Sequence, residues 1–397
     1  MPKTSPNPRK PTVALLIESS RSYGREICLG AAEYAHQHGE WNFVLQEHDL
    51  RTGVPEWLKT WKGDGILCRI YDKKLAAALA KAKCPVVDTY GQSRNPSIPF
   101  LDTDAAATAE MAARFFVNAT FKNFAFCGFP GLWFSDERSK AFVTAIKKYG
   151  SDVHVYQPPK SWSSPDVARR EALHPVGSKA LQKWITDLPR GTAILACNDI
   201  RAQQLIKVAA SCQRKIPDDL AVMGVDDDEM ICELTTPRLS SIKPDARNLG
   251  YTGARWLHLL MQGKTLPYHN LLIPPLHITE RASTDIIASD DELFTIAVRY
   301  IRKHVQEGID VNKVITHTQR SRSSLESRFK KHLGRSIKEE ITRARIARAV
   351  ILLRDTTMTQ QEIADASGFA TNSHFSRIFK QNQGLTPGQL RAKHRKP

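Results

Sequence analysis

The sequence lacks several features that mark whole classes of protein. It contains no run of 18 apolar residues, so a membrane span is not expected. Its seven cysteines are scattered and never form a Cys-x-x-Cys pair, which argues against a disulfide framework or a zinc site and suits a reducing cytoplasm. The first eleven residues hold four prolines and three cations without a following apolar segment. Residues 1–10 are therefore expected to be a disordered leader and not a signal peptide.

Motifs of common enzyme classes are also missing. No Gly-x-x-x-x-Gly-Lys-[Ser/Thr], Gly-x-Gly-x-x-Gly or Gly-x-Ser-x-Gly pattern occurs. His36 and His38 are close in sequence, but residues two positions apart on a helix face different directions and make a poor metal pair. We therefore expect no catalytic residue, no metal ligand and no cofactor. An enzyme fused to a second module is kept as an alternative.

Positive charge is unevenly distributed along the chain. The net charge is +16, and residues 289–397 alone hold 21 Lys and Arg against 11 Asp and Glu. A basic C-terminal module attached to a nearly balanced body is typical of nucleic-acid binding. A solvated basic surface would give the same totals, so the pattern inside the module must distinguish the two.

Residues 291–395 are predicted to form successive helices with short breaks. Ser321 is placed to cap a helix that Gly334 ends, and the Ser-x-x-Glu motif at Ser336 resembles a capping box. Two short units, each a helix, a turn and a second helix, thus flank one long helix. In a helix-turn-helix the second helix enters the major groove of DNA. A helical bundle with a polar face is the alternative, and the repetition of two basic units favours DNA binding.

Each unit leaves a polar face once its apolar stripe is buried. Arg can bind guanine, Asn can pair with adenine and Glu can accept from cytosine, while Lys and Ser suit phosphates. The residues expected to face DNA are Arg322, Ser323, Glu326, Ser327 and Lys330 in the first unit, and Asn372, Ser373, Ser376, Arg377 and Lys380 in the second.

The segments "SRSSLESRFKKHLGRS", "RARIARAVILLRDTTMTQQEIADASGF" and "SHFSRIFKQNQGLTPGQLR" resemble the AraC/XylS family of bacterial transcription regulators. The resemblance implies two helix-turn-helix units that read adjacent major-groove segments on one face of the DNA. It also implies which residues lie nearest the bases, namely Ser323, Glu326, Ser327, Asn372, Ser373, Ser376 and Arg377.

The first unit departs from the family pattern. His317 stands where a small Ala is usual, Gln319 where a turn Gly is usual, and Arg320 where an apolar residue is usual. Gln is costlier than Gly at a positive φ, and His in an Ala position is expected to crowd the helix pair. We therefore expect the first unit to dock less rigidly than the second.

Between residues 11 and 283, short apolar strands alternate with helices, which indicates parallel α/β sheets. Ligands of such sheets bind beyond the carboxyl ends of the strands. Carboxylate, amide, guanidinium and indole groups at these ends would suit a polyhydroxylated ligand. The candidates are Glu18, Arg21, Trp133, Arg138, Asn198, Asp199 and Asp226. Helix capping and loop charge are the alternative explanation for the same residues.

The segments "LDTDAAATAEMAARFF", "FAFCGFPGLWFSDERSKAF", "TAILACNDIRAQQLI" and "IPDDLAVMGVDDDEM" resemble the sugar-sensing half of LacI-type repressors. That half is built like the periplasmic sugar-binding proteins. The resemblance implies that Arg138, Asn198 and Asp226 bind the effector and that Asp199 contacts its hydroxyls.

The expected architecture is an α/β two-lobed, periplasmic-binding-protein-like sensor at 11–283, a linker at 284–290, and an all-α domain with two helix-turn-helix units at 291–395. This pairing of modules resembles bacterial activators that respond to pentoses. It implies D-xylose or a similar pentose as effector, operator DNA and RNA polymerase as partners, a homodimer, and a cytoplasmic location without membrane contact. A constitutive DNA-binding protein whose α/β body serves only dimerisation is the alternative.

Overall fold

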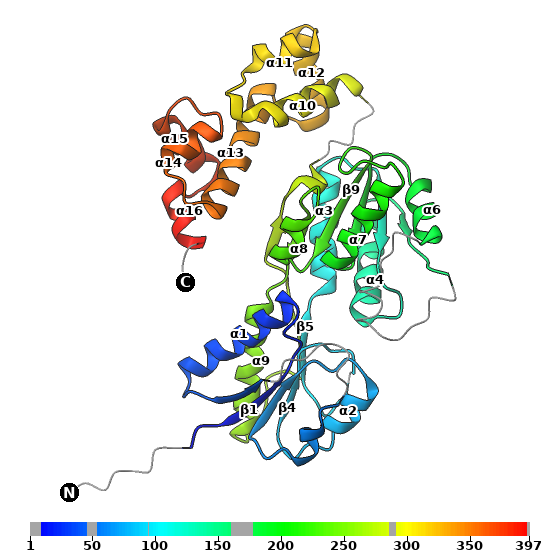
Figure 1. The fold of residues 1–397 in the computed structure, drawn as a ribbon, viewed down its shortest axis with the longest axis vertical. Coiled ribbons are helices and arrows are strands. Elements are labelled where there is room, and N and C mark those ends of the chain that lie inside the picture. Colours follow the sequence, from blue (N-terminus) through cyan, green and yellow to red (C-terminus); the bar gives the residue numbers. More distant parts are fainter. Residues whose placement is uncertain (1–8, 46–53, 94, 160–177, 286–290, 395–397) are drawn as a thin grey trace, which may run out of the picture. The chain divides into compact units, whose positions relative to one another are not determined.

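The computed structural model describes residues 9–45, 54–93, 95–159, 178–285 and 291–394 (Figure 1). The chain divides into two compact units, residues 1–286 and 287–397. Most of the expected leader, residues 1–8, lies outside the described residues. Arg9 and Lys10 are described, and they pair with Asp64 at 3.6 Å and Glu40 at 2.5 Å.

The first lobe of the first unit is a six-stranded parallel sheet, as far as the described residues show. Its strands are β1 (Thr12–Leu16), β2 (Asn42–Leu45), β3 (Gly65–Cys68), β4 (Val86–Asp88), β5 (Phe100–Thr103) and β11 (Asn270–Ile273). Their order is β11-β5-β4-β3-β1-β2, and every pair runs parallel. Short apolar runs such as Thr12–Leu16 form these strands because both faces of the sheet are covered.

Helices α1 (Ser22–Gln37) and α9 (Ala246–Met261) pack together in this lobe with their backbones in close approach. A Cβ added at Gly30 would lie 1.9 Å from the Arg247 carbonyl oxygen, and one at Gly250 would lie 2.0 Å from that of Ile27. Larger residues at these two positions would force the helices apart. On the other side of the sheet lie α2 (Lys73–Leu79) and the 3-10 helix η1 (Glu56–Thr60).

The second lobe repeats the plan of the first within the described residues. Its strands are β6 (Asn123–Cys127), β7 (Val153–Val155), β8 (Thr192–Ala196), β9 (Leu220–Val225), β10 (Ser240–Lys243) and β12 (His277–Thr279). They are ordered β12-β10-β9-β8-β6-β7, with β12 antiparallel to its neighbour. The helices are α3 (Ala105–Asn118), α4 (Trp133–Lys147), α6 (Lys179–Asp187), α7 (Asp199–Ser211) and α8 (Glu229–Leu234).

In the described chain, the backbone crosses between the lobes after β5, after β10 and after β11. Each lobe therefore contains segments that are far apart in sequence. All seven cysteines lie within the described residues, and all are free thiols.

The sensor ends later than the sequence indicated. Residues 282–284 form a short 3-10 helix, η3 (Ala282–Thr284), in which Ser283 and Thr284 are buried. The Thr284 hydroxyl lies 2.7 Å from that of Ser240 on β10. Thr284 therefore belongs to the sensor and not to the expected linker, because its polar group is satisfied there. Most of that linker, residues 286–290, lies outside the described part of the chain.

The second unit is helical, as the periodicity predicts. Its helices are α10 (Glu292–His304), α11 (Val311–Thr318), α12 (Arg322–Leu333), α13 (Ile337–Asp355), α14 (Gln360–Ala366), α15 (Asn372–Gln383) and α16 (Pro387–His394). Ser321 caps α12, Gly334 ends it at φ 68°, and Ser336 forms a capping box with Glu339. These three sequence predictions are confirmed.

The long helix α13 contributes to two separate apolar cores in this unit. The first core includes Phe294, Leu325 and Phe329, and the second includes Phe375 and Phe379. Each core supports one helix-turn-helix, α11–α12 or α14–α15. No helix among the described residues is long and apolar enough to cross a membrane.

Candidate functional site

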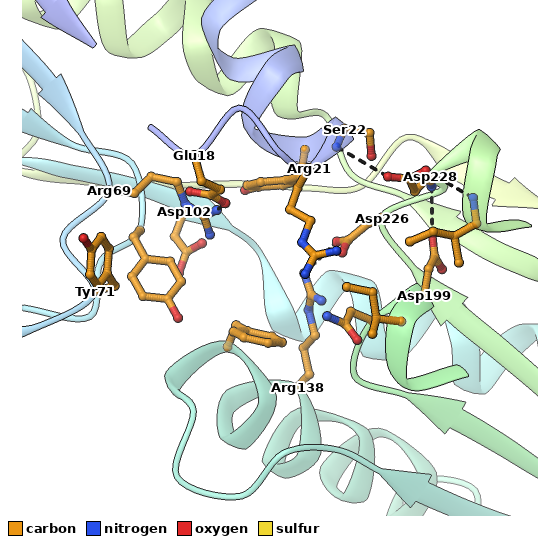
Figure 2. Close-up of a pocket in the computed structure, with 16 residues that line it drawn as sticks. Glu18, Arg21, Ser22, Arg69, Tyr71, Asp102, Arg138, Asp199, Asp226 and Asp228 are labelled. Carbon is orange, nitrogen blue, oxygen red and sulfur yellow. Dashed lines mark hydrogen bonds and ion pairs between the residues drawn. The ribbon is translucent and has the colours of Figure 1, made fainter. Parts of the chain in front are cut away.

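A cavity of about 840 Å³, a volume that includes space open to solvent, lies between the two lobes of the first unit, at the carboxyl ends of their parallel strands (Figure 2). The described lining combines guanidinium groups, carboxylates and aromatic rings. It consists of Glu18, Arg21, Ser22, Tyr23, Arg69, Tyr71, Tyr90, Asp102, Phe134, Arg138, Asn198, Asp199, Ile200, Asp226, Asp228 and Ile231. We call this cavity the cleft.

The cleft brings together every predicted ligand-binding residue except Trp133. Trp133 lines a neighbouring hollow, and its indole Nε1 donates to Asp102 Oδ2 at 3.4 Å. Phe134 supplies the aromatic face in the cleft instead. The reason is that α4 begins at Trp133, and successive helix residues point about 100° apart. Trp133 thus contacts the cleft residue Asp102 without lining the cleft itself.

The first lobe contributes an ion pair between Arg69 and Glu18, whose side chain is only 3% exposed. The Arg69 guanidinium lies 5.0 Å from the centre of the Tyr23 ring and 4.7 Å from that of Tyr90. These rings fix the guanidinium plane while the carboxylate balances its charge. Sequence reasoning missed Arg69, although it directly follows β3 and the same strand-end rule could have found it.

Asp102 is a second residue that sequence reasoning missed, since β5 was not recognised as a strand. It is half-buried at the boundary between the cleft and the hollow that contains Trp133. Burial raises the pKa of Asp102 to about 6, although a hydrogen bond from the Thr103 backbone N–H and the nearby Arg69 and Arg138 favour the charged form. The carboxyl group therefore changes charge close to neutral pH.

The second lobe places Arg138 and Asp226 beside each other. Arg138 Nη1 donates to the Cys197 carbonyl at 2.5 Å, and Nη2 lies 3.7 Å from Asp226 Oδ1. The Arg138 guanidinium also lies 5.6 Å from the centre of the Phe134 ring. Figure 2 shows Arg21 of the first lobe and Arg138 of the second pointing toward Asp226. Donors and acceptors in such a cluster can bind adjacent hydroxyls of a ligand.

The side chains of Asn198 and Asp199 already accept hydrogen bonds from other groups of the protein. Asn198 Oδ1 caps α7 by accepting from the Arg201 backbone N–H at 2.9 Å, as the capping alternative expects. Asp199 accepts from Ser241 Oγ at 2.5 Å and from the Asp228 backbone N–H at 2.8 Å. Burial raises the pKa of Asp199 well above its usual range, and the nearby Asp226 adds to the rise. These contacts fit support of the cleft wall better than direct binding of ligand hydroxyls.

A hydrogen bond between two cleft residues joins the two lobes. The Ser22 backbone N–H, at the start of α1, donates to Asp228 Oδ2 at 3.4 Å (Figure 2). Asp228 also caps α8 through the Ile231 backbone N–H at 3.3 Å. The start of one helix in each lobe therefore takes part in the same contact.

The predicted DNA-facing residues of the first helix-turn-helix divide into two groups. Arg322, Ser323, Ser327 and Lys330 are exposed on α12, opposite the buried Leu325 and Phe329. Glu326 is half-buried, and its Oε2 accepts from the Ile337 backbone N–H at the start of α13, at 3.2 Å. Glu326 thus caps a neighbouring helix, which competes with a role in reading bases.

The second reading helix, α15, shows the same division. Ser373, Arg377 and Lys380 are exposed on its surface. Asn372 and Ser376 are half-buried, and Ser376 Oγ lies 3.4 Å from Asn372 Oδ1. The exposed cations form the part of this face that can reach phosphates and base edges without rearrangement.

The atypical residues of the first unit behave differently from one another. Gln319 has a φ of 51°, the left-handed conformation expected for a position where Gly is usual. The prediction that His317 crowds the helix pair is wrong: His317 is exposed, and its ring stacks on Tyr300 at 4.0 Å. Thr318 occupies the buried position, where its hydroxyl bonds to the Val314 carbonyl at 2.9 Å.

Three protein-family models match separate stretches of the chain. Residues 12–106 match a XylR N-terminal domain, residues 113–284 a periplasmic binding protein-like domain, and residues 315–393 a helix-turn-helix domain. Together they cover most of the sensor and most of the two reading units described above.

Two relatives align along nearly the whole chain. The xylose operon regulatory protein of Escherichia coli is 31% identical over 391 residues, which cover 96% of both chains. That of Haemophilus influenzae is 29% identical over 388 residues, covering 96% of this chain and 97% of the relative.

Solved structures agree with the sequence relatives. The structure of the xylose-binding transcription activator xylR aligns with a TM-score of 0.68 and 29% identity, and covers 98% of this chain and 100% of that one. The transcriptional regulator CelR in complex with cellobiose, at 21% identity and a TM-score of 0.55, covers 70% of this chain and 86% of its own, and shares the fold of the sensor. From the full-length match and the two reading units, we conclude that the chain belongs to the xylose operon regulator family of DNA-binding transcription regulators.

Proposed function

We propose that this regulator binds xylose or a closely similar pentose in the cleft and that binding changes its affinity for operator DNA. One observation carries the proposal. A single chain combines a cleft lined by hydroxyl-binding groups with two basic helix-turn-helix units. The Escherichia coli and Haemophilus influenzae relatives, which are named for the xylose operon, align along the whole of this combination.

The polar groups of the cleft suit a small sugar. Arg138 and Asp226 offer a donor fork and an acceptor from the second lobe, and the Glu18–Arg69 pair offers the same chemistry from the first. Phe134 supplies an apolar surface for the C–H groups of a sugar ring. A ligand that contacts both lobes favours the lobe arrangement in which all its contacts are made.

The remaining parts of the proposal concern the partners. Exposed residues on α12 and α15 contact two adjacent major-groove segments of the operator. Paired half-sites require a homodimer, and control as an activator adds contact with RNA polymerase. A regulator of this kind works in the cytoplasm, where the operator is.

Calorimetric titration of the full-length protein with D-xylose, L-arabinose, D-ribose and D-glucose tests the effector. We expect D-xylose or one other pentose to bind in a single-site isotherm and to raise the melting temperature. Absence of binding by every pentose would overturn the proposal of a pentose effector. Operator binding that stays the same with and without a bound sugar would favour the constitutive alternative.

A further inference from the structure

Asp227 lies next to the cleft residue Asp226 but does not line the cleft itself. Both residues have a positive φ, 120° at Asp226 and 47° at Asp227. Residues other than Gly adopt such strained backbone conformations only where the surroundings hold them. The groups that hold Asp227 therefore also fix the direction in which Asp226 enters the cleft.

The groups that hold Asp227 come from β10, from β12 and from the residues that follow β12. Asp227 Oδ1 lies 2.9 Å from Arg281 Nη1, and Oδ2 accepts from Thr279 Oγ1 at 2.9 Å. The Asp227 backbone N–H donates to Ser241 Oγ at 3.0 Å. The ion pair is buried, with the side chains of Arg281 and Asp227 only 6% and 9% exposed. In such surroundings a charge-assisted hydrogen bond is strong and costly to disturb.

Arg281 continues these contacts toward the end of the sensor. Its Nε lies 2.9 Å from Glu233 Oε1 on α8, and its backbone N–H donates to Ser240 Oγ at 2.7 Å. The same Ser240 hydroxyl lies 2.7 Å from Thr284 Oγ1. Ser283 Oγ donates to the Val222 carbonyl on β9 at 2.6 Å. Residues 281–284, which directly precede the segment leading to the second unit, are thus bonded to the strands beneath the cleft.

A second route joins the same group of residues from another position in the second lobe. Ser241, which accepts from the Asp227 backbone, donates its own hydroxyl to Asp199 Oδ1 at 2.5 Å. Asp199 lines the cleft. Two cleft residues therefore reach Asp227, one through the adjacent peptide bond and one through Ser241.

We propose that Asp227 and Arg281 are positioning residues for the response to effector, connecting Asp226 in the cleft to residues 281–284 at the exit of the sensor. The inference rests on the proposed function, since it requires a ligand in the cleft. A ligand that draws on Asp226 changes the backbone at 226–227. Because the partners of Asp227 are buried and bonded, the change moves Arg281 and is not absorbed by solvent.

The test uses the full-length protein, D-xylose and an operator fragment, with the variants Asp227→Asn and Arg281→Lys. Asn tolerates a positive φ, so Asp227→Asn removes the charge pairing while keeping the backbone conformation. The matched control is Arg238→Lys, because Arg238 contacts the same Glu233 at 3.3 Å with a side chain that is 46% exposed. Sugar affinity is measured by calorimetry, and operator affinity by fluorescence anisotropy with and without D-xylose.

We expect both variants to keep the D-xylose dissociation constant within about threefold of the wild type, while the sugar-induced change in operator affinity falls at least about fivefold. Arg238→Lys should keep both properties. If circular dichroism shows that Arg281→Lys does not fold, the result with Asp227→Asn alone decides whether the inference stands.

Four outcomes would overturn the inference. Variants that retain the full response would show that Asp227 and Arg281 do not connect the sites, while the proposed function would stand. Loss of sugar binding in step with the response would make the pair part of the binding site. Equal loss in Arg238→Lys would indicate general weakening of α8. A wild type that binds none of the pentoses and does not respond to them would remove the proposed pentose function and this inference together.

Discussion

The cleft and the DNA-facing surface use charged side chains in opposite ways. In the cleft, guanidinium and carboxylate groups already pair with one another, as in Glu18–Arg69 and Arg138–Asp226. On α15, cations such as Arg377 are exposed to solvent. A ligand that enters the cleft must match a preset pattern of donors and acceptors, which gives selectivity. Exposed cations instead give an affinity for DNA that falls as the salt concentration rises. This affinity depends little on the DNA sequence unless a side chain also reaches a base.

The largest effect should come from breaking the paired charges of the cleft. Arg138→Ala removes a donor and leaves Asp226 without this partner, so effector affinity should fall at least about 100-fold, or about 3 kcal/mol. Calorimetry with the effector measures this loss, and operator affinity without effector should stay unchanged. Arg190→Ala is the matched control, because Arg190 is 83% exposed in the same lobe. Unchanged effector affinity in a folded Arg138→Ala variant would remove Arg138 from the site.

On the DNA-facing surface, substitution of one residue should have an effect on affinity that depends on the DNA sequence. Arg377→Ala should weaken operator binding by about 1–3 kcal/mol and binding to random DNA much less. Lys380, exposed one helical turn later, is the comparison residue. Lys380→Ala should weaken both DNAs alike and reduce the slope of log affinity against log salt by about 0.9. Equal losses on both DNAs for Arg377→Ala would mean that Arg377 contacts phosphate only.

Asp102 offers a pH test of the cleft. The folded state keeps a proton on Asp102 up to about pH 6, whereas the unfolded chain releases it near its ordinary pKa of about 4. Stability of the effector-free wild type should therefore fall as pH rises from about 4 to 6 and stay lower above that range. Asp102→Asn lacks this fall, so at pH 7.5 it should be more stable than the wild type by on the order of 1–3 kcal/mol.

Thermal melts of the wild type and Asp102→Asn between pH 4 and 8 provide the measurement. The difference between the two proteins should grow through pH 4–6 and then level off. Burial raises the pKa of Asp88 to about 7, and the charge of Asp102 adds to that rise, so most but not all of the Asp88 titration cancels in the difference. A difference that does not change with pH would show that Asp102 ionises normally.

The smallest effect concerns the backbone of the first reading unit. Gln319→Gly should stabilise the protein by up to about 1 kcal/mol, because Gln319 has a φ of 51° that Gly adopts without strain. Gly334→Ala should have the opposite effect, because Gly334 has a φ of 68°, which strains a residue with a Cβ. A Cβ there would meet nothing within 4 Å, so the backbone strain alone sets the sign. Urea unfolding of both variants gives the two signs. A loss of stability in Gln319→Gly would mean that contacts of the Gln side chain outweigh the strain.

The sequence predicts local structure well where a local signal decides it. Alternating strands and helices, the caps at Ser321 and Ser336 and the stop at Gly334 follow from residues within a few positions of one another. The strand-end rule also selects Arg138, Asn198 and Asp226, which line the cleft. These features depend on backbone hydrogen bonding and periodicity, which a single sequence encodes directly.

Contacts between distant segments were beyond prediction. The choice of Phe134 over Trp133 depends on the residue at which α4 begins. Glu326 caps α13 because the two helices pack together, and no spacing within α12 indicates it. Asp102 takes its pKa from burial by segments of both lobes. In each case the deciding partner is set by tertiary packing.

The interleaving of the lobes has a consequence for how the protein is made. The first lobe begins at β1 but needs α9 and β11, so it cannot be completed until Ile273 has been synthesised. Most of the second lobe, from α3 to β10, is one continuous insertion within the first. On a translating ribosome the inserted lobe can therefore assemble first. The cleft, which requires both lobes, would be among the last parts of the sensor to form.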